Sequence, residues 1–247
     1  MLCLYKPLLM KLDILVFAVH PDDAELGCSG TILKYIAQGK KVGIVDLTAG
    51  ELGTRGTKET RKVEAADASA ILGVHVRKNL GMRDGFFTND EAHQLQLIEI
   101  IRKYRPQIVL ANAIDDRHPD HGRAAALVTD AVFLAGLPKL KTSEAGIEQE
   151  AWRPNLLLHY IQDRYIKPDI LIDITPYWEQ KVAAIKAYKT QFFNPELQEP
   201  ATYISSSDFL AGIEARAREF GKSIQCSYAE GFTANKILGV TSLFDLK

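Results

Sequence analysis

Apolar residues along the chain follow two alternating patterns, short continuous runs and longer stretches with helical spacing. A continuous run predicts a strand that is covered on both faces, as strands of parallel sheets are. Strands are predicted at residues 12–19, 41–47, 74–80, 107–112, 156–161 and 170–174. Apolar residues three and four positions apart predict helices at 26–38, 59–72, 90–104, in a stretch ending near 135, at 176–188 and at 208–220.

The segments between these elements give weaker signals. Residues 74–80 are more polar than the other runs and predict a strand near an edge of the sheet. Residues 139–150 are polar and predict a surface excursion. Residues 190–207 contain prolines and consecutive serines and predict a loop. The tail at 228–232 has no periodicity that assigns it to either kind of element.

Strands and helices alternate, which predicts a Rossmann-like, doubly wound α/β fold with a mostly parallel sheet and helices on both faces. In the strand order 3-2-1-4-5, strands 1 and 4 are neighbours where the winding reverses, and ligands bind at their carboxyl ends. No repeat or linker divides residues 12–247, which are predicted to form one domain. Residues 1–11 are predicted to be an N-terminal extension rather than a signal peptide, with Met10 as an alternative start.

The composition argues against several classes of protein. The 247 residues are 47% hydrophobic and 25% charged with a formal net charge of −1, so no basic surface for nucleic acid is indicated. No apolar segment approaches the roughly 20 residues that span a bilayer. The three cysteines form no CxxC pair and predict neither a disulfide framework nor a cysteine zinc site, which fits a cytoplasmic protein.

Two short motifs follow the strands that the predicted topology makes neighbours. The first strand leads into His20-Pro21-Asp22-Asp23 and the fourth leads into His118-Pro119-Asp120-His121. A catalytic zinc takes three protein ligands, imidazoles and carboxylates among them, and lowers the pKa of a bound water to about 7. His20, Asp23 and one histidine of the second motif would satisfy this set. The other carboxylates and the spare histidine are then candidates for general base and acid.

The same residues also fit roles that need no zinc. Asp22 and Glu25 have the spacing of a capping box, and His118 with Asp120 is compatible with an ordinary N-terminal helix turn. The aspartates after strand 1 would also suit Mg²⁺ in a phosphotransfer domain, although histidine ligands favour zinc. The turn lacks GxGxxG, so a dinucleotide site is not indicated. His159 ends an apolar strand and is predicted to be a core histidine rather than part of the site.

Three segments together resemble the zinc-dependent N-acetylglucosaminyl deacetylases of the PIG-L/LmbE-like family. They are residues 18–25, residues 118–121 and the tail 228–232, and the resemblance extends over nearly the whole chain after residue 10. The loop 50–56 and the tail are most similar to the branch in bacillithiol biosynthesis, which deacetylates N-acetylglucosaminyl-malate. The resemblance implies an LmbE-like fold, a Zn²⁺ cofactor and a small-molecule N-acetylglucosaminyl substrate. It also makes a homo-oligomer plausible.

The resemblance implies roles for the residues of the first motif and one of the second. His20, Asp23 and His121 are implied as zinc ligands, and Asp22 is implied as the general base. The predicted activity is hydrolysis of the acetamide bond of an N-acetylglucosamine conjugate. The alternatives are an amidase that acts on a thiol conjugate or another N-acetylglucosaminyl substrate, and a non-catalytic metal-binding protein of the same fold.

Further residues receive roles from the same resemblance. His118 is implied as the group that stabilises the oxyanion or donates a proton, with Asp120 orienting it. Arg55 and Arg117 are candidates for binding the malate carboxylates, because a guanidinium binds a carboxylate in a bidentate fork. Phe209 aligns with a position at which some relatives have a tyrosine that gates the site.

Overall fold

Seven strands form one sheet, in the order β3-β2-β1-β4-β7-β9-β8, in a computed structural model that describes residues 10–192, 194–196 and 199–246. The strands are β1 Ile14–Ala18, β2 Val42–Thr48, β3 Val76–Met82, β4 Ile108–Ala111, β7 Leu156–Tyr160, β8 Ile170–Asp173 and β9 Ala229–Ala234. The five from β3 to β7 are parallel, and β9 runs antiparallel to both of its neighbours. The predicted doubly wound α/β fold is therefore confirmed, with β1 and β4 adjacent and β3 at an edge.

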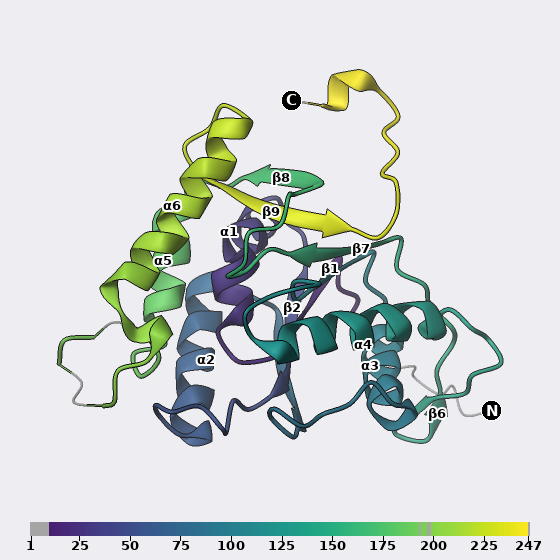
Figure 1. Cartoon of the computed structure of the whole chain (residues 1–247). Coiled ribbons are helices and arrows are strands. Elements are labelled where there is room, and N and C mark those ends of the chain that lie inside the picture. Colours follow the sequence, from purple (N-terminus) through teal and green to yellow (C-terminus); the bar gives the residue numbers. More distant parts are fainter. Residues whose placement is uncertain (1–9, 193, 197–198, 247) are drawn as a thin grey trace.

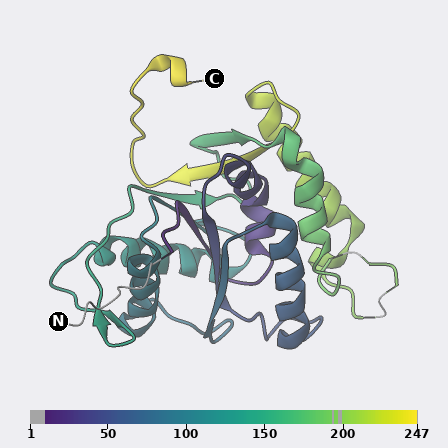
Figure 2. The ribbon, with the colours of Figure 1, turned by 180° about the vertical axis from the view of Figure 1, so that it is seen from behind.

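Helices cover both faces of this sheet (Figures 1 and 2). Their bounds are α1 Asp23–Ala37, α2 Lys58–Leu72, α3 Glu91–Tyr104, α4 Pro119–Ala135, α5 Trp178–Lys186 and α6 Ser207–Ser223. Figure 1 places α1, α2, α5 and α6 on one side and α3 and α4 on the other. Successive side chains of β1 point to opposite faces, as in any strand. Leu15 and Phe17 accordingly pack in the core against α3 and α4, while Val16 and Ala18 pack against α1.

Three stretches differ from the sequence-based expectation. The tail without periodicity contributes to β9, which is inserted between β7 and β8. Because β9 pairs with a strand on each side, its residues are buried without an alternating apolar pattern. The polar excursion contains a short hairpin of β5 Ser143–Glu144 and β6 Ile147–Glu148. The predicted loop before α6 contains a 3-10 turn, η2 Tyr203–Ser205.

The N-terminal prediction is largely untested. Residues 1–9 of the expected extension lie outside the described residues, and Met10 is exposed. Among the residues that the structure describes, no helix combines the length and the apolar composition needed to cross a membrane.

Candidate functional site

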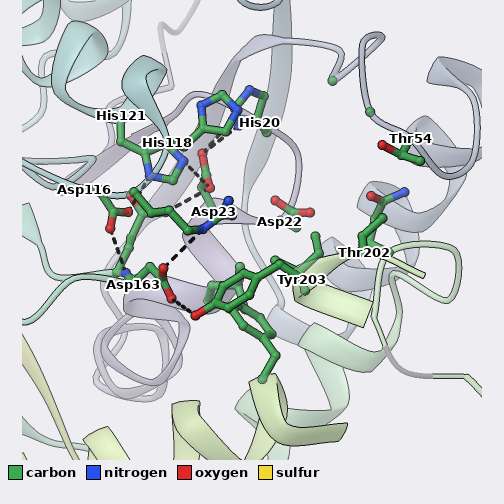
Figure 3. Close-up of a pocket in the computed structure, with 18 of the residues that line it drawn as sticks. His20, Asp22, Asp23, Thr54, Asp116, His118, His121, Asp163, Thr202 and Tyr203 are labelled. Atoms are coloured by element: carbon green, nitrogen blue, oxygen red, sulfur yellow. Dashed lines mark hydrogen bonds and ion pairs between the residues drawn. The ribbon is translucent and has the colours of Figure 1, made fainter. Parts of the chain in front are cut away.

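A cavity of about 580 Å³ opens at the carboxyl ends of β1 and β4 (Figure 3). Parallel pairing of Ile14 with Ile108 and of Val16 with Leu110 brings the ends of these strands to the same edge, so the two histidine motifs meet there. The wall opposite the motifs comes from η2 and α6, including Tyr203. This is the site that the predicted topology required.

Three histidines cluster on the inner wall of the cavity. His20, His118 and His121 each offer a ring nitrogen within 4.8 Å of the others, a spacing that could hold a metal ion. The rings of His20 and His118 meet edge to face at 4.8 Å between centroids, and His118 and His121 lie 5.3 Å apart. Residues separated by about a hundred positions in the chain are thus brought together.

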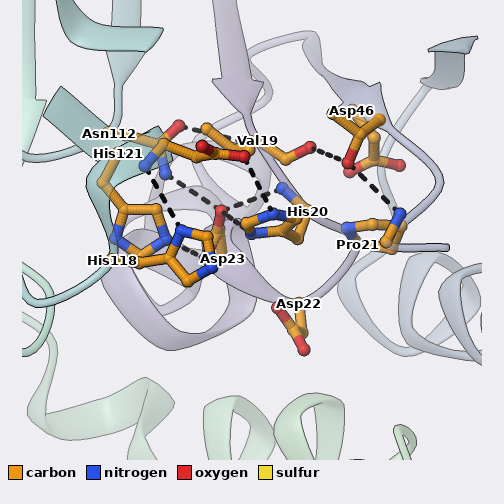
Figure 4. Close-up of polar contacts among 12 residues, drawn as sticks. Val19, His20, Pro21, Asp22, Asp23, Asp46, Asn112, His118 and His121 are labelled. Atoms are coloured by element: carbon orange, nitrogen blue, oxygen red, sulfur yellow. Dashed lines mark hydrogen bonds and ion pairs between the residues drawn. The ribbon is translucent and has the colours of Figure 1, made fainter. Parts of the chain in front are cut away.

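Asp23 lies between two of these histidines (Figure 4). Its Oδ2 is 3.6 Å from His20 Nδ1, and its Oδ1 is 3.2 Å from His121 Nε2. Ligands bound at about 2.0–2.1 Å to one tetrahedral cation lie about 3.4 Å apart. Each of these two distances is near that value, although they reach different oxygens of Asp23. Two imidazoles with one carboxylate would suit a borderline-soft metal.

Each of these two histidines has a second carboxylate on its other nitrogen. His20 Nε2 lies 3.0 Å from Asp84 Oδ1, and His121 Nδ1 lies 2.6 Å from Asp116 Oδ2. Histidines that bind metals commonly donate their remaining N–H to such a carboxylate, which fixes the tautomer and the ring orientation. The sequence-based reasoning missed Asp84 and Asp116. Both follow strands at this same edge, and that position is the signal that could have found them.

The protonation of the two histidines reflects these carboxylates. Burial lowers the pKa of His20, but hydrogen bonds with Asp23 and Asp84 outweigh it and raise that pKa to about 10. Burial also lowers the pKa of His121. The negative charge of Asp23 and the hydrogen bond with Asp116 outweigh this effect and raise that pKa to about 9. Without a metal, both imidazoles are therefore cationic at neutral pH, and they supply the positive charge next to these carboxylates.

Asp22 does not cap the helix that follows it. It stands at the N-cap position of α1, but its side chain makes no capping hydrogen bond, so the capping-box interpretation of Asp22 and Glu25 is wrong. Its φ of 127° is in a region that disfavours a side chain, and such strain, of order 1–3 kcal/mol, is often found at functional sites. The backbone turns the Asp22 carboxylate toward the cavity, away from the ligand-like Asp23 (Figure 3).

A buried arginine on α2 faces the Asp22 carboxylate. Arg61 Nη1 lies 3.3 Å from Asp22 Oδ2 and donates to the carbonyl of Pro21 at 3.1 Å. Burial raises the pKa of Asp22 to about 7, with Asp23 adding to the rise and Arg61 opposing it. The sequence offered no signal for Arg61, since a basic residue on a helix is usually solvent-exposed.

His118 and Asp120 occupy the start of α4. Burial and the neighbouring histidines lower the pKa of His118, so its ring is neutral at pH 7. Its Nδ1 accepts a hydrogen bond from the backbone N–H of Asp120 at 3.3 Å, which leaves the proton on Nε2. The Asp120 carboxylate instead binds Gly85 N–H and Arg123. Asp120 thus contacts His118 through its backbone, while its side chain faces the loop after β3.

The two arginines predicted to bind substrate both line the cavity but already have carboxylate partners. Arg55 is buried and pairs through Nε with Glu199 at 3.3 Å. Arg117 is exposed and pairs with Asp163 at 3.2 Å, and its guanidinium lies 4.5 Å from the centre of the Tyr203 ring.

The aromatic wall of the cavity contains both Phe209 and Tyr203, whose rings meet edge to face at 5.3 Å. Tyr203 donates its hydroxyl hydrogen bond to Asp163 at 3.1 Å. A phenol is therefore present at the site although position 209 lacks one, a contribution that sequence reasoning missed. His159 is fully buried and bonds to the carbonyl of Asn112 at 2.9 Å, as expected for a core histidine.

Comparisons with known proteins agree on one family. The model of the family described as PIG-L, GlcNAc-PI de-N-acetylase, matches residues 15–132. A diacetylchitobiose deacetylase of Thermococcus kodakarensis is 31% identical over 253 residues, an alignment that covers 92% of this chain and 89% of the relative.

A second relative and a solved structure extend this comparison. A 1D-myo-inositol 2-acetamido-2-deoxy-alpha-D-glucopyranoside deacetylase of Acidothermus cellulolyticus is 27% identical, with 74% of this chain and 80% of the relative covered. The crystal structure of the conserved protein TT1542 from Thermus thermophilus superposes with a TM-score of 0.82 at 38% identity and covers 93% of this chain and 98% of that one.

Proposed function

Because the chain belongs to the PIG-L family of GlcNAc-PI de-N-acetylases, we propose that it is a zinc-dependent hydrolase that deacetylates an N-acetylglucosamine conjugate. The observation that carries the proposal is the convergence of both histidine motifs around Asp23, with the Asp22 carboxylate beside them in the cavity. Two relatives, a diacetylchitobiose deacetylase and an acetamido-glucopyranoside deacetylase, support this substrate class. We further infer that residues 12–247 act as one cytoplasmic deacetylase domain, in a homo-oligomer.

His20, Asp23 and His121 are the residues that would hold the zinc. Asp23 lies within 3.6 Å of His20 and 3.2 Å of His121, and Asp84 and Asp116 contact the outer nitrogens of the two imidazoles. When bound, zinc lowers the pKa of water and polarises a carbonyl oxygen. The physiological identity of the metal can be tested by elemental analysis of the purified protein.

Asp22 and His118 would move the protons of the reaction. Asp22, as general base, removes a proton from the attacking water as its oxygen bonds to the acetamide carbon. His118 donates a hydrogen bond from Nε2 to the carbonyl oxygen as negative charge develops there. The proton held by Asp22 then passes to the nitrogen as the C–N bond breaks. The products are acetate and the free glucosaminyl amine.

The rest of the cavity would bind the sugar and its aglycone. A volume of about 580 Å³ is within the range of small-molecule sites and leaves room beyond one sugar ring. We propose N-acetylglucosaminyl-malate as the substrate, with Arg55 and Arg117 exchanging Glu199 and Asp163 for the malate carboxylates. A neutral disaccharide is the second candidate, because both arginines are already paired and a neutral ligand would leave these ion pairs intact.

Acetate release from a panel of substrates tests the proposal. Zinc-loaded protein is assayed with N-acetylglucosaminyl-malate, diacetylchitobiose and an N-acetylated thiol conjugate. Asp22→Ala is expected to lower kcat about 10²- to 10⁴-fold, the usual contribution of a general base. Asp115→Ala, at an exposed aspartate near the site, is the matched control and should retain wild-type activity.

Each outcome bears on one part of the proposal. Full activity of Asp22→Ala would remove Asp22 as the base. Preference for diacetylchitobiose would favour the neutral aglycone, and preference for the thiol conjugate would favour the related amidase. Zinc binding without hydrolysis of any substrate would make the chain a non-catalytic metal-binding protein.

A further inference from the structure

The helix that starts at the candidate site is broken. Within α1, Cys28 has φ −147° and ψ 17°, which are not helical values, so Asp23–Gly27 and Ser29–Ala37 are two helical pieces joined at a kink. The first piece carries Asp23 and follows Asp22. A change at the break would therefore reach these two carboxylates through the first piece.

A buried ion pair lies in the break. Lys181 of α5 and Glu230 of β9 meet at 2.7 Å and are almost fully buried, with side chains 2% and 4% exposed. Lys181 Nζ donates to the carbonyl oxygens of Glu25 at 3.1 Å and Leu26 at 2.8 Å.

Glu230 binds the other side of the break. Its Oε1 accepts from Gly30 N–H at 2.9 Å, and its Oε2 accepts from Thr31 N–H at 2.7 Å and from the Thr31 hydroxyl at 2.6 Å. In an unbroken helix, the N–H of Gly30 would donate to the carbonyl of Leu26. Here the cation binds that carbonyl and the anion binds that N–H, so the ion pair lies between the two groups.

The charges match the ends that they bind. The end of one helical piece presents carbonyl oxygens, which favour a cation, and the start of the next presents N–H groups, which favour an anion. Charge-assisted hydrogen bonds are stronger than neutral ones. A neutral pair of side chains would therefore bind the same backbone groups less strongly.

α1 packs closely against its neighbours on both sides of the break. A methyl group at Gly27 would lie 2.2 Å from Cδ2 of Tyr160, and one at Gly30 would lie 2.7 Å from Cδ1 of Ile174. The two glycines let the helix approach Tyr160 of β7 before Cys28 and Ile174, which follows β8, after it. The ion pair then satisfies the backbone groups that the change of direction leaves without helical partners.

We propose that Lys181 and Glu230 are positioning residues, which aim Asp22 and Asp23 through the break in α1. Neither lines the cavity, so neither touches substrate. This assigns a role to the tail motif at 228–232, whose glutamate enters the core beneath the site. The proposal rests on the proposed function for its kinetic consequence, but its effect on metal binding is independent of any substrate.

The test uses Glu230→Gln, Lys181→Met and the double variant in the full chain, with Lys34→Met as the matched control. Lys34 lies in the last turn of α1, beyond the break, and donates to the carbonyl of Asp173. The measurements are kcat and KM for deacetylation, zinc affinity by competition with a chromophoric chelator, and the thermal midpoint.

Each single variant is expected to lower kcat about 10- to 100-fold while KM changes less than about threefold, because misplacement of the reacting groups by about 1 Å costs this much. Zinc affinity should weaken about tenfold, since Asp23 is displaced. Lys34→Met should match the wild type in all measurements.

The double variant separates positioning from a merely structural role. It removes both charges, so an effect that came only from an unpaired buried charge would disappear, and kcat would recover. Positioning predicts that kcat stays low, because Leu26 and Gly30 still lack charged partners.

Wild-type kcat and zinc affinity in folded Glu230→Gln would overturn the proposal. If Lys181→Met does not fold, Glu230→Gln alone decides. If the wild type shows no deacetylation, the proposed function fails, and the zinc affinity of Glu230→Gln still tests the positioning role.

Discussion

Replacing Arg61 by methionine tests whether this buried arginine sets the protonation of the base. The two charges are 3.3 Å apart, and both residues are almost fully buried. At an effective dielectric constant of about 20, such a pair interacts by about 5 kcal/mol as an upper figure. Arginine neighbours lower carboxyl pKa values by about 1–3 units in proteins.

The direction of the expected change in the pKa of Asp22 follows from the opposing effects of burial and of Arg61. Burial favours the neutral carboxyl and raises its pKa to about 7, while Arg61 favours the anion. Removing the guanidinium should therefore raise the pKa of Asp22 further, by about two units in the middle of the usual range. At pH 7 the ionised fraction would then fall from about one half to about 1%, a loss of about 50-fold in base-catalysed rate.

The assay is the pH dependence of kcat for acetate release by Arg61→Met, between pH 6 and pH 10. The rate should be about 50-fold low at pH 7 and should approach the wild-type plateau at pH 10, where Asp22 is ionised in both proteins. Lys62→Met, at the exposed neighbouring position, is the control and should leave the profile unchanged. A loss of equal size at every pH would refute the reasoning and would assign Arg61 to substrate binding instead.

Three further predictions concern the metal ligands and the helix behind them. Asp116→Asn weakens the outer contact of His121 and should lower zinc affinity about 10- to 100-fold in chelator competition; unchanged affinity would contradict this role. Zinc must displace protons from His20 and His121, whose pKa values are raised to about 10 and about 9. Calorimetric titration should therefore show affinity rising steeply from pH 6 to pH 9, and a flat profile would exclude them as ligands. Gly27→Ala, with its methyl group 2.2 Å from the Tyr160 ring, should lower the free energy of unfolding by about 1–3 kcal/mol in urea titration; wild-type stability would contradict the close approach.

The sequence could predict the strands whose side chains are buried on both faces of the sheet. β1 and β4 are continuous apolar runs, the topology rule for alternating strands and helices predicts that they are neighbours, and they pair in the sheet. The same two steps brought His20 and His118 to one edge. Local pattern and a general rule of topology were sufficient because neither depends on how individual side chains dock.

Other parts depend on contacts that no local pattern contains. Arg61 lies among polar neighbours on α2, and only the docking of that helix against the turn after β1 buries its guanidinium. Glu230 belongs to β9, and its partners Gly30 and Lys181 are far away in the chain. Asp22 and Glu25 have the spacing of a capping box, but that prediction is wrong. Asp22 has a φ of 127°, and its side chain points toward the cavity instead of capping the helix.

The charges at the site connect folding, protonation and metal binding. Asp23, Asp84 and Asp116 have only neutral groups and the two histidines as hydrogen-bond and ion-pair partners among the described residues. Without a metal, the raised pKa values of His20 and His121 stabilise the fold fully below about pH 6.5, and this contribution is lost as pH rises through about 9 and 10. A divalent cation bound between the same side chains would supply the positive charge that the histidines lose. The metal thus competes with protons for the ring nitrogens. It would stabilise the folded chain most at high pH, where the histidines of the metal-free site are neutral and no longer balance the negative charge of the carboxylates.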